Sequence, residues 1–257
     1  MNTCIYNTPL ALGKAAGEGA AQLIRNAIAS NGSANIILAT GTSQFETLKE
    51  LVAAKDIQWN KVVMFHLDEY ISLPILHPAS FRKYLQERFL SQIPKLKNAW
   101  LINGETDALQ ECRRLGDLIQ KHPIDVALIG IGENGHLAFN DPPADFEIEE
   151  PYIIVELDDS CKKQQMGEGW FQSVDEVPQR AISMSVKQIL KSKHIICSVP
   201  GTRKAIAVKN TLEKEISNLY PSTILQTHNN CTLYIDENAA TSLNAATKEK
   251  IKCIRNN

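Results

Sequence analysis

Four short apolar runs, each ended by small or polar residues, constrain the fold of this chain more than any other feature. The runs are NIILA at 35–39, VVMFHL at 62–67, DVALIGI at 125–131 and HIICSVP at 194–200. Their length and nearly uninterrupted apolar character are typical of strands that are buried on both faces. We therefore expect a sheet with a layer of helices on each side.

Helix-length segments with apolar residues at three- and four-residue spacing lie between these runs. They are residues 22–29, 43–54, 81–90, 109–121 and 203–212. The order strand, helix, strand predicts an α/β fold of modified Rossmann-like type, with a mainly parallel sheet and helices on both faces. Because no repeat, low-complexity tract or Ser/Gly-rich linker interrupts the pattern, residues 1–257 are expected to form a single domain.

Charge and cysteine content exclude several classes of protein. Lys plus Arg number 27 and Asp plus Glu number 29, a balance without the basic surplus that nucleic acid or an anionic membrane requires. The six cysteines form no Cys-x-x-Cys pair, so we expect reduced thiols and no metal site.

The N-terminus lacks a signal-peptide pattern and no apolar run approaches the roughly 20 residues of a membrane span, which predicts a cytoplasmic protein. The oligomeric state stays open, and a homo-oligomer is compatible with the sequence.

The residues that follow the four runs favour a ligand site. They are Thr40–Ser43, Asp68–Tyr70, Gly132–His136 and Gly201–Lys204. In open α/β sheets the ligand crevice lies outside the carboxyl ends of the strands, so these turns are expected to line one pocket. A single polar turn is ordinary, but four together favour a site over chance.

The segment Thr-Gly-Thr-Ser at 40–43 leads directly into a predicted helix. Backbone amides of such a turn, together with the helix dipole, make a cradle for an anion such as phosphate. An ordinary helix start with Ser43 as N-cap explains the same residues equally well. The ammonium of Lys204, at the start of the helix after the fourth run, supports the phosphate interpretation.

Residues 130–135 match the dinucleotide fingerprint Gly-x-Gly-x-x-Gly. That fingerprint needs a helix that opens at its third glycine, whereas Pro142 and Pro143 follow closely and break one. We therefore reject nucleotide binding at this turn and expect no cofactor.

Two acid/base candidates lie in these turns. Asp68 ends a buried strand, where burial tunes the proton affinity of a carboxylate that acts as a general base; a capping role is the alternative. His136 with Asp141 is the second, because a carboxylate fixes the tautomer of an imidazole and stabilises its charged form. A lone histidine is more often structural, but this one lies in a polar, glycine-rich turn.

The same segments resemble the glucosamine-6-phosphate deaminase/isomerase family, within the wider group that includes the 6-phosphogluconolactonases. The resemblance runs over most of the chain and is most specific in FHLDEYISLPILHPASFRKYL at 65–85 and DVALIGIGENGHLAFNDP at 125–142. These motifs favour the deaminases over the lactonases. The resemblance implies hydrolytic deamination of glucosamine 6-phosphate to fructose 6-phosphate and ammonia, without metal or redox cofactor, on a small-molecule phosphosugar substrate.

The resemblance also implies a role for each matching residue. His136, helped by Asp141, would open the sugar ring, and Asp68 would then move the C2 proton to C1. Asn134 joins the catalytic set at a position where many deaminases have Asp. The substrate phosphate would be bound by residues of two turns and a later strand, namely Thr40, Gly41, Thr42, Ser43, Arg180 and Lys204.

Three departures from the family pattern leave alternatives open. Asn134 and Asp141 replace the more common Asp and Glu, and the shorter Asp141 side chain brings the position of its carboxylate into question. Residues 161–175 look unlike the family and are expected to form a lid with its own specificity. The remaining hypotheses are the same reaction on galactosamine 6-phosphate, a 6-phosphogluconolactonase-like hydrolase, and a sugar-phosphate sensor without turnover.

Overall fold

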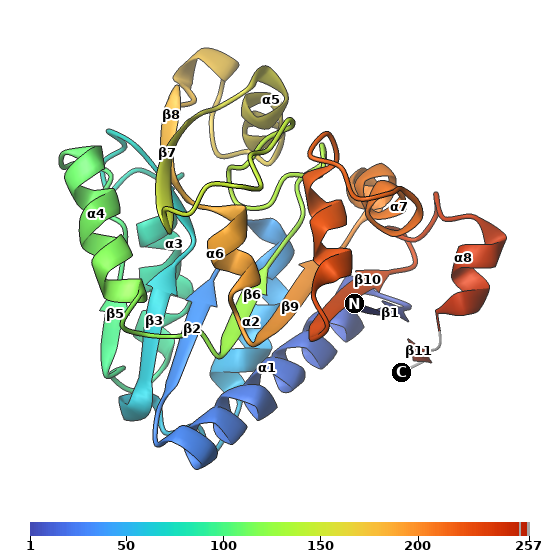
Figure 1. The fold of residues 1–257 in the computed structure, drawn as a ribbon, viewed down its shortest axis with the longest axis horizontal. Coiled ribbons are helices and arrows are strands. Elements are labelled where there is room, and N and C mark those ends of the chain that lie inside the picture. The colour runs from blue at the N-terminus through green and yellow to red at the C-terminus, as the bar shows by residue number, and fades with distance from the viewer. Residues whose placement is uncertain (252, 256–257) are drawn as a thin grey trace.

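The computed structural model describes residues 1–251 and 253–255, which form two sheets with flanking helices (Figure 1). The larger sheet has eight strands in the order β11-β1-β10-β9-β6-β2-β3-β5, and every neighbouring pair is parallel. In chain order its strands are β1 Asn2–Tyr6, β2 Ala34–Leu38, β3 Val62–His66, β5 Asn98–Trp100, β6 Val126–Ile129, β9 His194–Val199, β10 Cys231–Asp236 and β11 Cys253–Arg255. The predicted α/β class with a parallel sheet is confirmed.

The smaller sheet is antiparallel and has the order β4-β8-β7. Its strands are β4 Asp68–Tyr70, β7 Tyr152–Glu156 and β8 Arg180–Met184. Only Leu67 separates β4 from β3, so the chain passes directly from one sheet to the other. In Figure 1 the small sheet and α5 lie above the carboxyl ends of the large-sheet strands. The small sheet therefore stands over the edge where a ligand crevice is expected.

Helices cover both faces of the large sheet. Their bounds are α1 Pro9–Asn31, α2 Phe45–Ala53, α3 Phe81–Arg88, α4 Ala108–Ile119, α5 Asp159–Gly167, α6 Val186–Leu190, α7 Ala205–Glu213 and α8 Ala245–Lys250. Helix α1 begins where Thr8 accepts a hydrogen bond from the Ala11 amide, with Pro9 at its first position, and ends at Gly32 in the left-handed region. No helix in the described part of the chain is long and apolar enough to cross a membrane.

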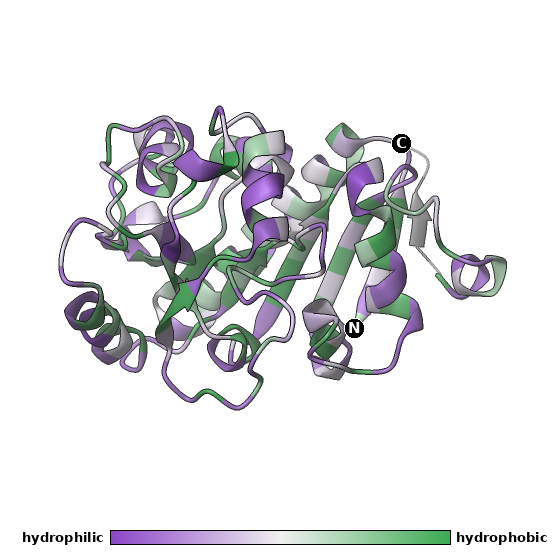
Figure 2. Cartoon of the chain, turned by 90° about the horizontal axis from the view of Figure 1, so that it is seen from above, coloured by the Kyte–Doolittle hydropathy of each residue, from purple (hydrophilic) through white to green (hydrophobic). Residues whose placement is uncertain are grey.

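Alternate residues of each strand point to opposite faces, and this divides the core into two layers. Ile37 and Phe65 pack in the layer that includes α4 residues, whereas Ile36 and Met64 pack in the layer that includes α1 and α2 residues. Figure 2 shows the hydrophobic strands in the centre with helices on either side. The nearly uninterrupted apolar runs of the sequence follow from this burial on both faces.

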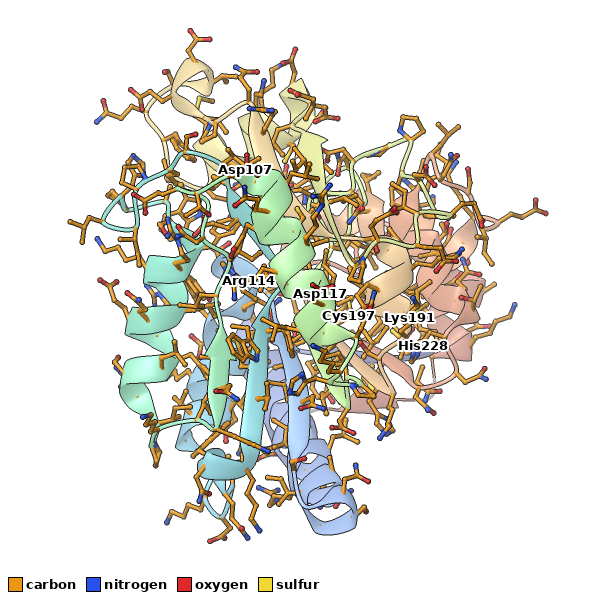
Figure 3. The ribbon with its side chains drawn as sticks, turned by 60° about the vertical axis from the view of Figure 1, so that its left-hand side comes forward. Asp107, Arg114, Asp117, Lys191, Cys197 and His228 are labelled. Carbon is orange, nitrogen blue, oxygen red and sulfur yellow. The ribbon has the colours of Figure 1, made fainter. Side chains whose placement is uncertain are left out.

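Helix α4 illustrates how an amphipathic segment lies on the sheet. Asp107 is its N-cap and accepts from the Gln110 amide at 2.8 Å, and Arg114 pairs with Glu111 at 2.6 Å. Figure 3 shows Asp107, Arg114 and Asp117 along this helix, while Leu115 is buried toward the sheet.

Most of the predicted segments begin and end within two residues of the observed bounds, but two helix starts need correction. Helix α1 begins at Pro9 instead of residue 22, because its first half is rich in Ala and Gly and offers few large apolar residues to the periodic pattern. Ser43 is not an N-cap, since residues Thr42–Gln44 form a 3₁₀ turn and α2 begins only at Phe45. The ordinary capped-helix explanation of the Thr-Gly-Thr-Ser segment is therefore wrong.

Candidate active site

The candidate site lies where the strand order reverses, between β2 and β6. From β2 the chain proceeds toward β3 and β5 on one side, and β6 begins the return toward β9 and β10 on the other. Loops diverge at such a switch point and leave a crevice at the carboxyl ends of the strands. A cavity of about 70 Å³ lies there, and residues from all four polar turns line it.

Two similar corners form one side of this cavity. Gly41 (φ +93°) precedes the 3₁₀ turn Thr42–Gln44 and then α2, and Gly201 (φ +94°) precedes the 3₁₀ turn Thr202–Lys204 and then α7. Glycine is favoured at both corners because the positive φ strains other residues. Strands β2 and β9 both pair with β6, so the corners stand on either side of its end.

A side chain of α3 and one of the corner's own 3₁₀ turn fix the first corner. Tyr84 Oη donates to the Gly41 carbonyl at 3.0 Å, and Gln44 Nε2 donates to the Ile129 carbonyl at 3.2 Å. Lys204, from the second corner, is buried and lines the cavity. Burial lowers its pKa, opposed by the nearby carboxylates of Glu168 and Glu133. The corners thus bring backbone amides and one ammonium to a single small space, as an anion requires.

Asp68 faces the same cavity from the first position of β4 and is 7% exposed. Burial raises its pKa to about 8, with a smaller contribution from the carboxylate of Glu69. Glu69 accepts from the backbone amides of Phe81 at 3.1 Å and Arg82 at 2.8 Å, and from Ser80 Oγ at 3.0 Å. The adjacent carboxylates thus differ in role: Glu69 anchors the start of α3, and Asp68 is left at the cavity.

His136 reaches the cavity from the turn after β6. Its Nδ1 lies 3.0 Å from Asp141 Oδ1, and its backbone amide donates to Asn134 Oδ1 at 3.0 Å. Asn134 Nδ2 donates to the same Asp141 oxygen at 2.9 Å. Burial opposes ionisation of Asp141, but the hydrogen bonds from His136 and Asn134 hold its pKa below the usual range. An ionised Asp141 accepts from Nδ1–H of His136, which leaves Nε2 free to exchange a proton.

The shorter Asp141 side chain therefore does reach His136. Gly132 makes room for the imidazole, because a Cβ atom at this position would lie 2.3 Å from the ring. No nucleotide-type helix follows Gly135; instead, Leu137 and Asn140 form an antiparallel bridge.

Helix α5 covers the cavity, and Gln164, Gln165 and Glu168 from this segment contribute to its lining. Gln164 Oε1 accepts from the Glu133 amide at 2.8 Å, and Arg203 Nη1 donates to the Gly167 carbonyl at 3.3 Å. A volume of about 70 Å³ is far below the roughly 300–1,000 Å³ of small-molecule pockets. The cavity is thus narrow for a small-molecule ligand.

The structure brings most of the predicted residues together. Thr40–Ser43, Asp68, His136 and Lys204 line the cavity, whereas Asp141 and Asn134 lie behind His136. Sequence reasoning missed Glu168, which the structure adds to this set, although it lies in the segment 161–175 that departs from the family pattern.

Arg180 is not at the cavity. It begins β8 with an exposed side chain, whereas the partner of Asp68 on this strand is Ser183, three residues and thus about 10 Å further along. Among the described residues Lys204 is the one Lys or Arg in the cavity lining. The expected clamp of two cations is not formed in this structure.

Comparisons with known proteins agree with the motifs. A family model described as glucosamine-6-phosphate isomerases/6-phosphogluconolactonase matches residues 7–234. Glucosamine-6-phosphate deaminase of Streptococcus uberis is 35% identical over 88% of this chain and 94% of its own length, and that of Bacillus cereus is 32% identical over 93% and 88%.

Solved structures agree as well. A monomeric glucosamine-6-phosphate deaminase superposes with a TM-score of 0.85 at 31% identity, over 94% of this chain and 100% of that one. A 6-phosphogluconolactonase from Trypanosoma brucei superposes with a TM-score of 0.75 at 16% identity, over 95% and 98%, which shows a shared fold alone.

Proposed function

The chain belongs to the glucosamine-6-phosphate isomerase/6-phosphogluconolactonase family of enzymes, and we propose that it is a glucosamine-6-phosphate deaminase. The reaction is glucosamine 6-phosphate plus water to fructose 6-phosphate plus ammonia. The observation that carries this proposal is that Asp68, His136 and the anion cradle face one cavity. Asp68 can act as the base that removes a proton from carbon, His136 can act as the acid/base group for ring opening, and the cradle can bind the phosphate.

The phosphate of the substrate binds at the two corners. Amides of residues 41–43 donate to its oxygens and the ammonium of Lys204 supplies the opposing charge. Arg180 takes no direct part in this scheme. A rigidly held phosphate fixes the rest of the sugar relative to the acid/base groups. This positioning contributes to the rate enhancement.

Proton transfers then follow in sequence. His136 Nε2 exchanges a proton with the ring oxygen as the pyranose opens, and Asp141 stabilises the imidazolium that forms. Asp68 removes the proton from C2 and returns it to C1, which converts the amino aldose into the imine of the ketose. Water adds to this imine and ammonia leaves. Each acid/base group contributes roughly 10²- to 10⁴-fold in rate.

The narrow cavity must widen for substrate to bind. Helix α5 is the segment to move, because its contacts to Glu133 and Arg203 are few and lie at the cavity edge. Closure over the bound sugar would then exclude water from the reacting carbon atoms. The residues of α5 that face the cavity would contribute to the choice between the glucosamine and galactosamine epimers.

We further propose that residues 1–257 act as one domain and that the enzyme works in the cytoplasm on a phosphosugar, without nucleic acid. The two sheets share core residues, since Ile182 and Met184 of β8 pack in the same cluster as Phe65 of β3. This shared core supports a single unit.

The experiment is the release of ammonia and ketose 6-phosphate by the purified protein. Glucosamine 6-phosphate, galactosamine 6-phosphate and 6-phosphogluconolactone are supplied separately. Turnover of glucosamine 6-phosphate is expected, with a loss of roughly 10²- to 10⁴-fold in Asp68→Asn. Lactone hydrolysis needs no base for a carbon acid, so hydrolysis that survives Asp68→Asn would favour the lactonase. Phosphate-dependent binding without turnover of any of the three would favour a sensor.

A further inference from the structure

Three different side chains that can ligate a metal, one of them His136, lie close together beside the cavity. Atoms of His136, Asp141 and Cys161 that can ligate a metal all lie within 4.8 Å of one another. Imidazole, carboxylate and thiolate are the ligands of tetrahedral zinc sites, in which zinc–ligand distances of about 2.0–2.3 Å place the ligands between three and four ångströms apart. Nδ1 of His136 and Oδ1 of Asp141 are already 3.0 Å apart, so only the longer separations in the cluster must shorten, by up to about 1 Å, to surround such an ion.

Cys161 is held in this position by the start of α5. Asp158 Oδ1 accepts from the Cys161 amide at 2.6 Å, and the Asp158 amide approaches Asp141 Oδ2 at 3.5 Å. The Cys161 side chain is buried beside Asp141. The His–Asp pair and the cysteine are therefore placed by separate elements, the turn after β6 and the lid helix.

A second, larger cavity reaches one member of this cluster, Asp141. It has a volume of about 610 Å³ and is lined by Asp141 and Asp158, with Asp145, Glu150 and Glu156 also in its wall. Carboxylates around a cavity attract cations and raise their local concentration. The His136–Asp141 pair thus connects the two cavities, because His136 lines the candidate site and Asp141 lines the larger, acidic cavity.

We infer that His136, Asp141 and Cys161 bind a borderline-soft divalent cation, with zinc the best match. Binding displaces the thiol proton of Cys161 to solvent and shifts the imidazole proton of His136 from Nδ1 to Nε2, so that Zn²⁺, one thiolate, one carboxylate and a neutral imidazole sum to zero charge. A neutral complex suits a buried position, where an uncompensated charge is costly. The hard ions Mg²⁺ and Ca²⁺ prefer all-oxygen ligands and fit this set poorly.

Bound zinc would inhibit the enzyme, a consequence that rests on the proposed function. Ligation occupies Nδ1 of His136 and an oxygen of Asp141, so the pair loses the hydrogen bond by which Asp141 stabilises the imidazolium. The same ion ties α5 to the turn after β6. Zinc therefore blocks both the ring-opening step and the movement of the lid.

The test uses full-length protein freed of metal with a chelator and then titrated with Zn²⁺ or Co²⁺. We expect one zinc per chain and, with Co²⁺, a thiolate-to-cobalt charge-transfer band in the near ultraviolet. In Cys161→Ser the zinc affinity should fall at least about 10-fold and the band should vanish. The matched control is Cys112→Ser, a buried cysteine that lines the same large cavity, and it should keep both.

A wild-type protein without the cobalt band would overturn the inference, and this measurement needs no variant. Unchanged zinc affinity in Cys161→Ser would overturn it too. Ammonia release should fall in wild type as zinc binds, with no effect of Mg²⁺; equal inhibition of Cys161→Ser contradicts the site. If the metal-free protein releases no ammonia, the proposed function fails, while the binding and spectroscopic results still decide the metal site.

Discussion

Asp68 lies where the chain leaves the large sheet for the small one, and this position accounts for its chemistry. Water is largely excluded there, and the neighbouring carboxylate of Glu69 belongs to the anchor of α3. A base that removes a proton from carbon benefits from a raised proton affinity, provided that it is ionised in an adequate fraction of molecules. The fold raises the proton affinity of Asp68 mainly by burial, with a smaller contribution from the carboxylate of Glu69.

The pKa of Asp68 can be measured in the free protein. We expect a side-chain carboxyl carbon that titrates near pH 8, because burial raises the pKa of Asp68 to about 8. The readout is ¹³C NMR of the aspartate carboxyl carbons, and the signal should be missing in Asp68→Asn. Since the base must be ionised, kcat/KM should rise with pH through the same range. A titration with no such signal above pH 6 would contradict this account.

Asn134 tests the departure from the family pattern. Its amide donates to Asp141, which an aspartate cannot do, so Asn134→Asp places two carboxylates in hydrogen-bond contact. Like charges at this distance cannot both stay ionised, and the support for His136 is weakened. We expect a loss of at least about 10-fold in kcat. Affinity for inorganic phosphate should be unchanged, since Asn134 does not line the cavity. Full activity would argue against the geometry described for the pair.

At the residue scale, a site residue could be predicted from the sequence where it follows the end of a predicted strand. Asp68, His136 and Lys204 each come just after an apolar run, and the rule that ligands bind at the carboxyl ends of strands brings them together. Arg180 could not be placed this way. It lies at the start of an antiparallel strand, and its distance from the cavity depends on the pairing of β8 with β4, which no local pattern reveals.

At the scale of elements, α5 determines how the site opens and what it admits. A Cβ atom at Gly41 would lie 3.9 Å from Glu168 Oε2, so a carboxylate lies over the anion cradle. Trp170 Nε1 donates to this carboxylate at 3.3 Å and Gln164 Nε2 donates to it at 2.9 Å. A bound phosphate would repel the Glu168 carboxylate, so this side chain must move away when phosphate binds.

Glu168→Gln should therefore strengthen phosphate binding. Removal of the negative charge is expected to lower the inhibition constant of inorganic phosphate about 5-fold, on the order of 1 kcal/mol for a partly exposed charge. The measurement is competition with substrate at low ionic strength. Glu176→Gln is the matched control, an exposed carboxylate outside the cavity, and it should have no effect. Weaker phosphate binding in Glu168→Gln would mean that the carboxylate supports the cradle instead.

Helices and strands could be predicted where their apolar residues form a regular pattern. They could not be predicted where contacts with distant parts of the chain determine the structure. The four predicted strands are neighbours inside the large sheet. Because both of their faces are buried, their sequences are nearly uninterrupted apolar runs. Strand β8 escaped prediction as an element because RAISM is short and mixes polar with apolar residues, although four of its five residues are buried. Its stability comes from pairing with β4 and β7, which are distant in sequence.

At the scale of the whole molecule, the site depends on both sheets. The cradle and His136 come from turns of the large sheet, while Asp68 begins a strand of the small one. Residues of β3, β6 and β8 share one hydrophobic cluster, so separation of the sheets would expose buried surface on each. Cooperative unfolding of the two sheets is the expected consequence.

Two tryptophans on different parts of the molecule can test this cooperativity. Trp59 is buried in the layer beside α1 and α2, and Trp170 packs on the cluster above the small sheet. In each of two variants that keep only one of these tryptophans, with Trp100→Phe in both, the fluorescence midpoint should coincide with the far-ultraviolet circular dichroism midpoint of the same variant. Phosphate at 100 times its dissociation constant adds about 2.7 kcal/mol, which should raise both midpoints by roughly 5 to 10 °C. If the Trp170 signal melts first and phosphate shifts it alone, the small sheet and α5 unfold as a separate unit, and the single-domain proposal fails.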